Sequence, residues 1–170
     1  MLIREFAPGD WDEVWPIIRE VVRAADTYTY DPAMTPEQAR ETWIEPSDES
    51  GLTVVAVREG RILGTAKMGR NRPGPGAHVS TASFMVAADA RGRGVGRGLV
   101  GHALGWAREQ GYAGMQFNAV AASNVHAVRL YETLGFQIVG TVPGAFEHPL
   151  LGRVGLHVMY CDLGTAAREA

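Results

Sequence analysis

The sequence predicts a mixed α/β protein in which one β-sheet is flanked by helices on both faces. Residues 52–57 and 62–68 are two apolar, β-branched runs separated by Glu59 and Gly60, a pattern typical of a β-hairpin. Elsewhere, segments with apolar residues at helical spacing alternate with further strand-like runs. There is no internal repeat and no linker, so we expect the 170 residues to form a single domain, 1–170.

The N-terminal part begins with an apolar run over residues 2–6 that predicts a first strand. Asp10 is placed to cap a helix, and valine and isoleucine at spacings of three and four residues carry this helix to about Ala25. Residues 26–32 are polar and aromatic, and we expect them to form a loop.

A second helix is expected to start after Thr35, with Pro36 at its first position and Gln38 completing a capping box. Residues 70–77 are rich in proline and glycine and predict an exposed loop after the hairpin. Residues 78–87 then form a strand that leads into a basic, glycine-rich turn.

A long helix follows this turn and is expected to end near Gln110. Gly98, Gly101 and Gly105 lie inside it, and each costs about 1 kcal/mol relative to alanine. That cost suggests close packing of the helix against a sheet or a ligand at these three positions.

Four further elements complete the order. We expect a strand over residues 113–120, a helix from Val125, and strands over residues 136–142 and 154–161. The last two strands follow the last helix directly and are joined by residues 143–153.

Composition and charge exclude several classes of protein. The formal net charge of -3 argues against nucleic acid as a main partner. The first residues are too charged for a signal peptide and no apolar run is long enough to span a membrane, so we expect a cytoplasmic protein without a membrane partner. The one cysteine, Cys161, cannot form an internal disulfide and fits a small buried residue on the last strand.

The stretch from Val86 to Arg97 is the strongest functional signal in the chain. It leads from an apolar strand through a basic, glycine-rich turn into a helix. Glycines let backbone N–H groups approach a ligand, and the free N–H groups and dipole of a helix N-terminus favour an anion. Three arginines can add bidentate pairing to phosphate: Arg91, Arg93 and Arg97.

Two nucleotide-binding motifs do not match this turn. A P-loop needs a lysine after its glycines, and the only lysine of the chain is Lys67. The Rossmann fingerprint Gly-x-Gly-x-x-Gly is not matched either, because the glycines of residues 92–98 alternate. The spacing that is present is Arg-x-x-Gly-x-Gly, as Arg91, Gly94 and Gly96.

This spacing resembles the pyrophosphate-binding motif of the GNAT superfamily of N-acetyltransferases, which bind acetyl-coenzyme A. A second motif lies about 30 residues downstream, where Asn124 begins a helix that carries Tyr131 and ends at Gly135 and Phe136. Superfamily members typically show asparagine, alanine, an apolar residue and tyrosine before a Gly-Phe pair. Both motifs occur in the expected order, so the chain resembles this superfamily over about residues 80–136.

The resemblance implies a fold and a cofactor site. The sheet would be mostly antiparallel and V-shaped, and acetyl-coenzyme A would be the co-substrate, with no metal. The pantetheine arm would lie against the strand before the turn, and the turn would bind the pyrophosphate. Asn124 could contact the cofactor, cap its helix, or do both. The expected cofactor-binding residues are Phe84, Met85, Val86, Arg91, Gly92, Arg93, Gly94, Val95, Gly96, Arg97 and Asn124.

Tyr131 is the residue that the resemblance assigns to catalysis, as the general acid that protonates the departing thiolate. A thiol with a pKa of about 8.5 and a phenol with a pKa of about 10 can exchange a proton at small cost. The alternative is a tyrosine that packs on the coenzyme without donating a proton.

The general base and the acceptor contacts are less defined. Asp26, Glu45, Glu147 and His148 are polar candidates for the base, and a chain of water molecules is the alternative to all of them. By resemblance, the acceptor contacts come from the loop after the first helix and from a second segment near the C-terminus. The expected substrate-binding residues are Tyr28, Tyr30, Phe146 and His148.

Together these observations predict an N-acetyltransferase that acts on the primary amine of a small molecule, such as an amino acid or an amino-acid-like compound. Two alternatives share the cofactor site: a protein acetyltransferase acting on a lysine or an N-terminus, and a non-catalytic acyl-coenzyme A sensor. Tyr131 disfavours the sensor, because a non-catalytic member could lose this residue freely. The oligomeric state is left open, a homodimer being one alternative.

Overall fold

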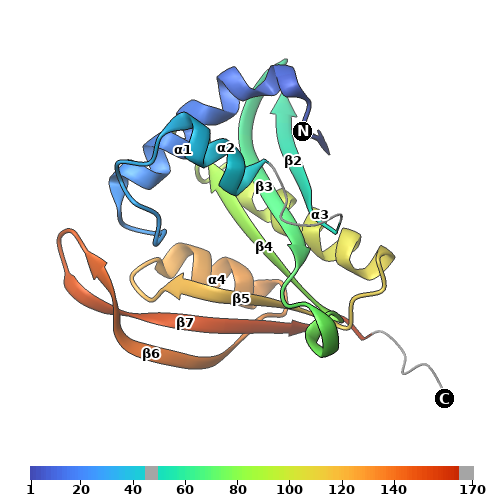
Figure 1. Cartoon of the computed structure of the whole chain (residues 1–170), viewed down its shortest axis with the longest axis vertical. Coiled ribbons are helices and arrows are strands. Elements are labelled where there is room, and N and C mark those ends of the chain that lie inside the picture. Colours follow the sequence, from blue (N-terminus) through green and yellow to red (C-terminus); the bar gives the residue numbers. More distant parts are fainter. Residues whose placement is uncertain (45–49, 165–170) are drawn as a thin grey trace.

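The computed structural model describes residues 1–44 and 50–164, which form one seven-stranded sheet with helices against both faces (Figure 1). The strand order is β1-β2-β3-β4-β5-β7-β6. Neighbouring strands are antiparallel, except that β4 and β5 are parallel. The strands are β1 (Leu2–Glu5), β2 (Leu52–Arg58), β3 (Arg61–Arg70), β4 (Val79–Val86), β5 (Gly114–Ala121), β6 (Gln137–His148) and β7 (Gly152–Asp162).

The α-helices pack on opposite faces of the sheet, as the two sides of β3 show. Successive residues of a strand point to opposite faces. A Cβ placed on Gly64 would lie 3.2 Å from side chains of α3, whereas the Thr65 hydroxyl accepts a hydrogen bond from Trp43 of α2 at 3.1 Å. None of the described helices is long and apolar enough to cross a membrane. The α-helices are α1 (Trp11–Ala24), α2 (Pro36–Trp43), α3 (Val95–Glu109) and α4 (Val125–Thr133).

The sheet opens at its middle. β4 and β5 pair only through Val79 with Gly114 and Ser80 with Met115. Beyond Ser80 the two strands run apart, and Figure 1 shows β4 and β5 diverging like the arms of a V. The expected V-shaped, mostly antiparallel sheet is confirmed.

One hydrophobic core holds α1, α2 and α3 to the sheet. Trp43 is 1% exposed and is part of this core, which also contains buried residues of α1, β2 and α3. Its indole N–H donates to Thr65, and its carbonyl accepts from the Thr53 hydroxyl at 2.8 Å. Because its polar groups are paired, burial of this large ring leaves no donor unsatisfied.

The start of α2 follows local sequence rules, whereas the start of α1 does not. Thr35 Oγ1 accepts from the Gln38 N–H at 3.3 Å and Gln38 Oε1 accepts from the Thr35 N–H at 2.9 Å, which confirms the capping box. Asp10 precedes α1, but its side chain makes no capping hydrogen bond to that helix. Its carboxylate instead pairs with Arg4 at 2.6 and 2.8 Å and accepts from the Ala7 N–H. A bidentate pair with a guanidinium is stronger than a neutral cap, and the Arg4 pair lowers the pKa of Asp10.

The connection expected over residues 143–153 is wrong, because both strands extend into it. β6 continues to His148 and β7 begins at Gly152, so the turn between them is short. Pro143 lies within β6, with a register irregularity between Val142 and Phe146. Because β6 is the edge strand of the sheet, a proline there removes no ladder hydrogen bond from a second neighbour.

The three glycines inside α3 do not have the same structural explanation. A Cβ on Gly98 would meet Met1 of the N-terminal segment, so the helix packs closely at that position. A Cβ on Gly101 or Gly105 would meet nothing within 4 Å. Close packing therefore explains Gly98 alone, and nothing in the structure explains the other two.

We expect Gly101→Ala to raise the free energy of unfolding by about 0.5–1 kcal/mol, since it restricts the unfolded chain and fills open space. Gly64→Ala is the matched opposite, because its Cβ would lie 2.8 Å from the Met85 carbonyl oxygen and 3.2 Å from α3. Crowding of this kind costs about 1–3 kcal/mol. Urea unfolding of both variants measures the two signs, and destabilisation by Gly101→Ala would contradict the packing described here.

Candidate active site

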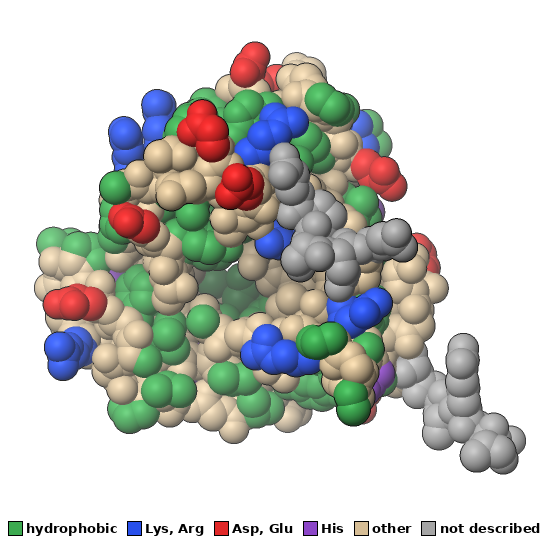
Figure 2. All heavy atoms as spheres, in the orientation of Figure 1, with side chains coloured by type: hydrophobic (Ala, Val, Ile, Leu, Met, Phe, Trp, Pro, Cys, Tyr) green, Lys and Arg blue, Asp and Glu red, His purple; other side chains and the backbone are tan. Residues whose placement is uncertain are grey.

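A cavity of about 990 Å³ occupies the space between the diverging strands β4 and β5. Its walls come from the loop after α1, the free edge of β4, the start of α3, β5 and α4. Figure 2 shows the molecule hollowed in this region, with hydrophobic side chains around the opening. The separation of the sheet therefore creates a space that no single element encloses.

The N-terminus of α3 lines one end of this cavity. Gly94 is its N-cap, with φ +81° and no side chain that could cap the helix. The first intrahelical hydrogen bond runs from the Gly98 N–H to the Gly94 carbonyl at 3.0 Å. The three N–H groups before it, of residues 95–97, have no place in the helical ladder and are available to an anion.

Charged side chains around this turn favour an anion. Arg91 and Arg97 line the cavity, and Arg97 also donates to Thr133 on α4 at 2.8 Å. Asp89 would repel a phosphate, but Arg61 pairs with it at 2.7 and 3.0 Å and lowers its pKa. Arg93 is not among the residues that line the cavity, unlike the other residues of the turn that the sequence predicted.

The free edge of β4 presents backbone groups to the cavity. The Ala87 N–H donates a hydrogen bond to the Leu63 carbonyl of β3. Because backbone groups alternate between the two edges of an antiparallel strand, the N–H and C=O groups of Met85 also point to β3. Those of Phe84 and Val86 point to the cavity. The Tyr28 hydroxyl binds Phe84 on that edge: it donates to the Phe84 carbonyl at 2.7 Å and accepts from the Phe84 N–H at 2.9 Å. Val86 is therefore the next residue along the edge toward the α3 turn.

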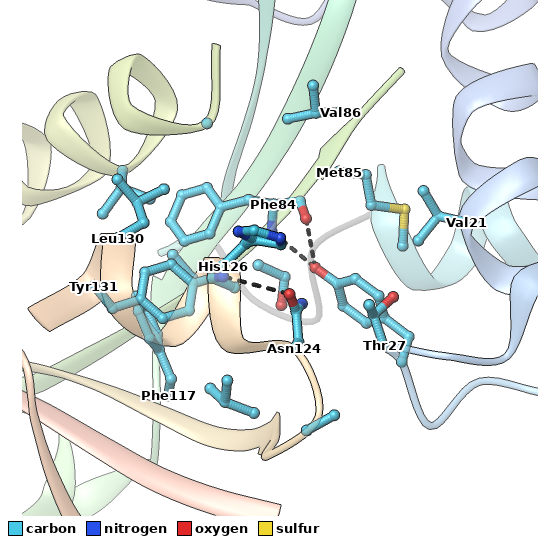
Figure 3. A pocket seen from close by; sticks show the side chains of 18 of the residues that line it. Val21, Thr27, Phe84, Met85, Val86, Phe117, Asn124, His126, Leu130 and Tyr131 are labelled. Carbon is cyan, nitrogen blue, oxygen red and sulfur yellow. Dashed lines mark hydrogen bonds between the residues drawn. The ribbon is translucent and has the colours of Figure 1, made fainter. Parts of the chain in front are cut away.

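Tyr131 lies on α4 with its ring among aromatic neighbours. Ring centroids lie 4.7 Å away at Phe117, 5.9 Å at Phe136 and 6.3 Å at Phe84. Figure 3 shows Tyr131 and Phe117 on the side of the cavity opposite Thr27. Burial in this apolar surrounding raises the pKa of Tyr131 to about 12, because the phenolate would be poorly solvated.

Asn124 caps α4 and also lines the cavity. Its side-chain oxygen accepts from the Ala127 N–H at 3.3 Å. The same residue belongs to the cavity wall, so the cap leaves its amide group near the enclosed space. The two roles considered for this residue are thus compatible.

The opposite end of the cavity is lined by Asp26, Tyr28, Tyr30 and His148. Phe146 does not line it; its buried ring lies 6.5 Å from the His148 ring, which it supports edge-on. Two further residues considered as bases are absent from this wall. Glu147 lies outside the set of lining residues, and Glu45 lies outside the described part of the chain.

The hydrogen bonds of His148 settle which of its nitrogens carries a proton in the neutral ring. Nδ1 accepts from the N–H groups of Leu150 and Leu151 at 3.1 and 3.3 Å. A nitrogen that accepts is unprotonated, so the neutral ring holds its proton on Nε2. Its one basic nitrogen is therefore already occupied by the β6–β7 turn.

Charge is segregated along the cavity. Among the described lining residues, Arg91 and Arg97 carry the guanidinium groups, both beside the α3 turn, and Asp26 carries the carboxylate at the other end. The Tyr28–Phe84 contact could not be predicted from the sequence. No local signal could have shown it, because the two residues are 56 positions apart.

Comparison with known proteins agrees with this geometry. The pattern of the Acetyltransferase (GNAT) family matches residues 15–136. A GCN5-related N-acetyltransferase from Kribbella flavida has a similar structure, with a TM-score of 0.91 and 52% sequence identity over 95% of this chain and 96% of that one. The yncA protein of Salmonella typhimurium, solved with its cofactor acetyl-CoA, has a TM-score of 0.81 at 22% identity, over 100% of this chain and 98% of that one.

A curated relative also matches part of the chain. The L-methionine sulfoximine/L-methionine sulfone acetyltransferase of Pseudomonas aeruginosa is 31% identical over 107 residues, which are 61% of this chain and 62% of that protein. Two other curated relatives are matched over 46% and 14% of their lengths. This chain thus spans less than two thirds of each of these curated relatives.

We expect the Tyr131 phenol to stay protonated through pH 11, because its pKa is raised to about 12 whereas an exposed tyrosine ionises near pH 10. An ultraviolet titration of the wild type minus that of Tyr131→Phe isolates this group. The difference should show no tyrosinate below about pH 11. A tyrosinate signal centred near pH 10 would contradict the desolvated site described above.

Proposed function

This chain belongs to the GNAT family of acetyltransferases, and from that premise we propose that it transfers an acetyl group from acetyl-coenzyme A to the primary amine of a small molecule. One observation carries the proposal: a single cavity joins an uncapped helix N-terminus, a buried phenol and a polar end that contains a carboxylate. Acetyl transfer needs these three parts within reach of one extended co-substrate.

The residues of the α3 turn fit a pyrophosphate. The N–H groups of residues 95–97 and the guanidinium groups of Arg91 and Arg97 supply donors and positive charge. From there, an extended arm would run along the free edge of β4 past Val86 toward Phe84, whose backbone groups already bind Tyr28, and Asn124 lines the same cavity. The acetyl-CoA in the yncA structure supports this assignment through the shared fold.

Acetyl-coenzyme A supplies an activated thioester, and residues of the chain donate and accept the protons that the reaction transfers. The C–N bond forms as the C–S bond breaks, the amine nitrogen loses one proton, and the departing sulfur gains one. Tyr131 donates that proton from its hydroxyl in this proposal. Its pKa, raised to about 12, keeps the hydroxyl protonated, but it also widens the gap to the thiol, so donation costs more than between the unperturbed groups.

We favour Asp26 as the general base that accepts the proton from the amine. It lines the acceptor end, and its carboxylate attracts an ammonium group before transfer. His148 is less suited, because its Nδ1 already accepts two backbone N–H groups and its Nε2 is a donor in the neutral ring. His148 can instead orient a polar group of the acceptor.

The acceptor we propose is a small molecule rather than a protein side chain. Tyr30 and His148 line the acceptor end from two separate segments, the loop after α1 and the β6–β7 hairpin. The named activity of the Pseudomonas relative, on L-methionine sulfoximine and L-methionine sulfone, supports a small amine. We place the enzyme in the cytoplasm, in keeping with its composition.

A screen of amines tests the proposal. Acetyl-coenzyme A is mixed with amino acids, other small amines, and peptides with a lysine or a free N-terminus, and free thiol is measured over time. Thiol release with a small amine is the expected result. Release only with peptides would indicate a protein acetyltransferase, and binding of acetyl-coenzyme A without any release would indicate a sensor.

We expect Gly94→Val to weaken acetyl-coenzyme A binding by at least tenfold. Valine is strained at φ +81°, and its side chain would extend into the approach of the phosphate. Calorimetry measures the dissociation constant. Gly74→Val is the matched control, because Gly74 also has a positive φ, of +59°, with open space around it, and does not line the cavity. Equal affinities in the two variants would remove the turn from the cofactor site.

We expect Tyr131→Phe to lower kcat by about 10²- to 10⁴-fold while the affinity for acetyl-coenzyme A changes little, since the ring remains and only the proton donor is lost. The loss should shrink when the leaving thiol is a better leaving group. Tyr112→Phe serves as the control, because Tyr112 packs on Trp106, away from the cavity. Near-normal turnover in Tyr131→Phe would leave Tyr131 as a packing residue.

A further inference from the structure

The Tyr28 hydroxyl uses both backbone groups of Phe84 that face the cavity. The donated and accepted hydrogen bonds, of 2.7 and 2.9 Å, close the free edge of β4 at this one residue. In a strand, backbone groups on the same edge recur every second residue. An extended ligand that enters from the α3 turn therefore meets Val86 first and reaches a closed edge at Phe84, about 7 Å further on.

The Tyr28 ring is held in place from two other sides. It stacks on Tyr30 with centroids 5.5 Å apart and planes 4° apart, and it meets the buried Trp43 edge-on at 6.2 Å. Trp43 is in turn bonded to Thr65 of β3. A ring with two hydrogen bonds and two aromatic neighbours cannot move aside without loss of several contacts at once.

The reacting end of the co-substrate must lie next to this ring. If Tyr131 protonates the sulfur, the sulfur lies within hydrogen-bond reach of Tyr131, whose ring is 6.3 Å from that of Phe84. The acyl carbon is bonded to that sulfur. Because the arm arrives along β4 from Val86, the acyl group continues in the direction of Phe84 and of the Tyr28 ring that closes the edge there.

The residues behind the expected position of the acyl group are closely packed. Figure 3 shows Met85 and Val21 on the same side of the cavity as Thr27, the neighbour of Tyr28. Both are core residues, 1% and 7% exposed. In this direction a longer acyl chain would meet the fixed Tyr28 ring and then this packed core.

We propose that Tyr28 is the residue that limits the acyl donor to acetyl, by forming the end wall of the acyl site. The proposal rests on the function proposed above, because it places a thioester at Tyr131. It also changes the role of Tyr28: its side chain meets the acyl group rather than the acceptor amine, and Tyr30, Asp26 and His148 remain for the amine.

Calorimetry with acetyl-, propionyl- and butyryl-coenzyme A tests this wall directly, together with kcat/KM for each thioester and one accepted amine. The wild type should prefer acetyl over butyryl by at least tenfold, since each methylene that does not fit costs about 10-fold or more. Tyr28→Ala should reduce that preference by at least tenfold. Tyr28→Phe keeps the ring and should retain most of the preference.

Tyr30→Ala is the matched control, because it removes a ring of the same loop that stacks on Tyr28 but makes no hydrogen bond to β4. It should change the KM of the amine more than the ratio between acyl donors. Equal binding of acetyl- and butyryl-coenzyme A by the wild type would overturn the proposal even if Tyr28→Ala fails to fold. An unchanged ratio in a folded Tyr28→Ala would overturn it too. If none of the three thioesters binds, the proposed function itself is wrong.

Discussion

The parting of β4 and β5 is the constraint on which the rest of the structure depends. Only two residue pairs join these parallel strands, at their N-terminal ends. A fully paired sheet would consume the backbone groups of β4 on both edges and fill the space with β5. Because the strands diverge, β4 keeps one free edge, and the turn at its C-terminal end carries α3 to the rim of the opening. The cavity therefore follows from the incomplete pairing of the two central strands.

The wall of this cavity has two chemically different parts. The α3 turn offers unpaired N–H groups and guanidinium groups, with the charge of Asp89 balanced by Arg61. The aromatic cluster around Tyr131 is dry, which raises the pKa of the phenol and keeps its proton in place. In the proposed function, the turn binds the anionic end of the co-substrate and proton transfer takes place at the apolar wall. The two parts also differ in exposure: residues 91–94 of the turn are exposed, whereas the Tyr131 phenol is desolvated.

Several local features could be predicted because their causes lie within a few residues. The capping box of Thr35 and Gln38 and the N-cap of Asn124 depend on hydrogen bonds across three residues. The positive φ angles of Gly94 and Gly135, at a helix start and just after a helix end, follow from the same short range. The β6–β7 connection was predicted wrongly, because both strands extend into residues 143–153 and Pro143 lies inside β6. Whether proline breaks a strand depends on whether that strand has a second neighbour, which is not a local property.

The sequence by itself determined the order of the elements, the caps of α2 and α4, and the glycine-rich turn before α3, since these rest on side chains and backbone angles that are close along the chain. The tertiary structure alone decided which groups share the cavity. It brought Tyr28 onto Phe84 across 56 residues, placed His148 at the wall with Phe146 behind it, and turned the Asp10 carboxylate from a cap into the partner of Arg4. The physical reason is that a buried hydroxyl or carboxylate takes the best partner that folding delivers to it, and that partner is set by packing rather than by sequence distance.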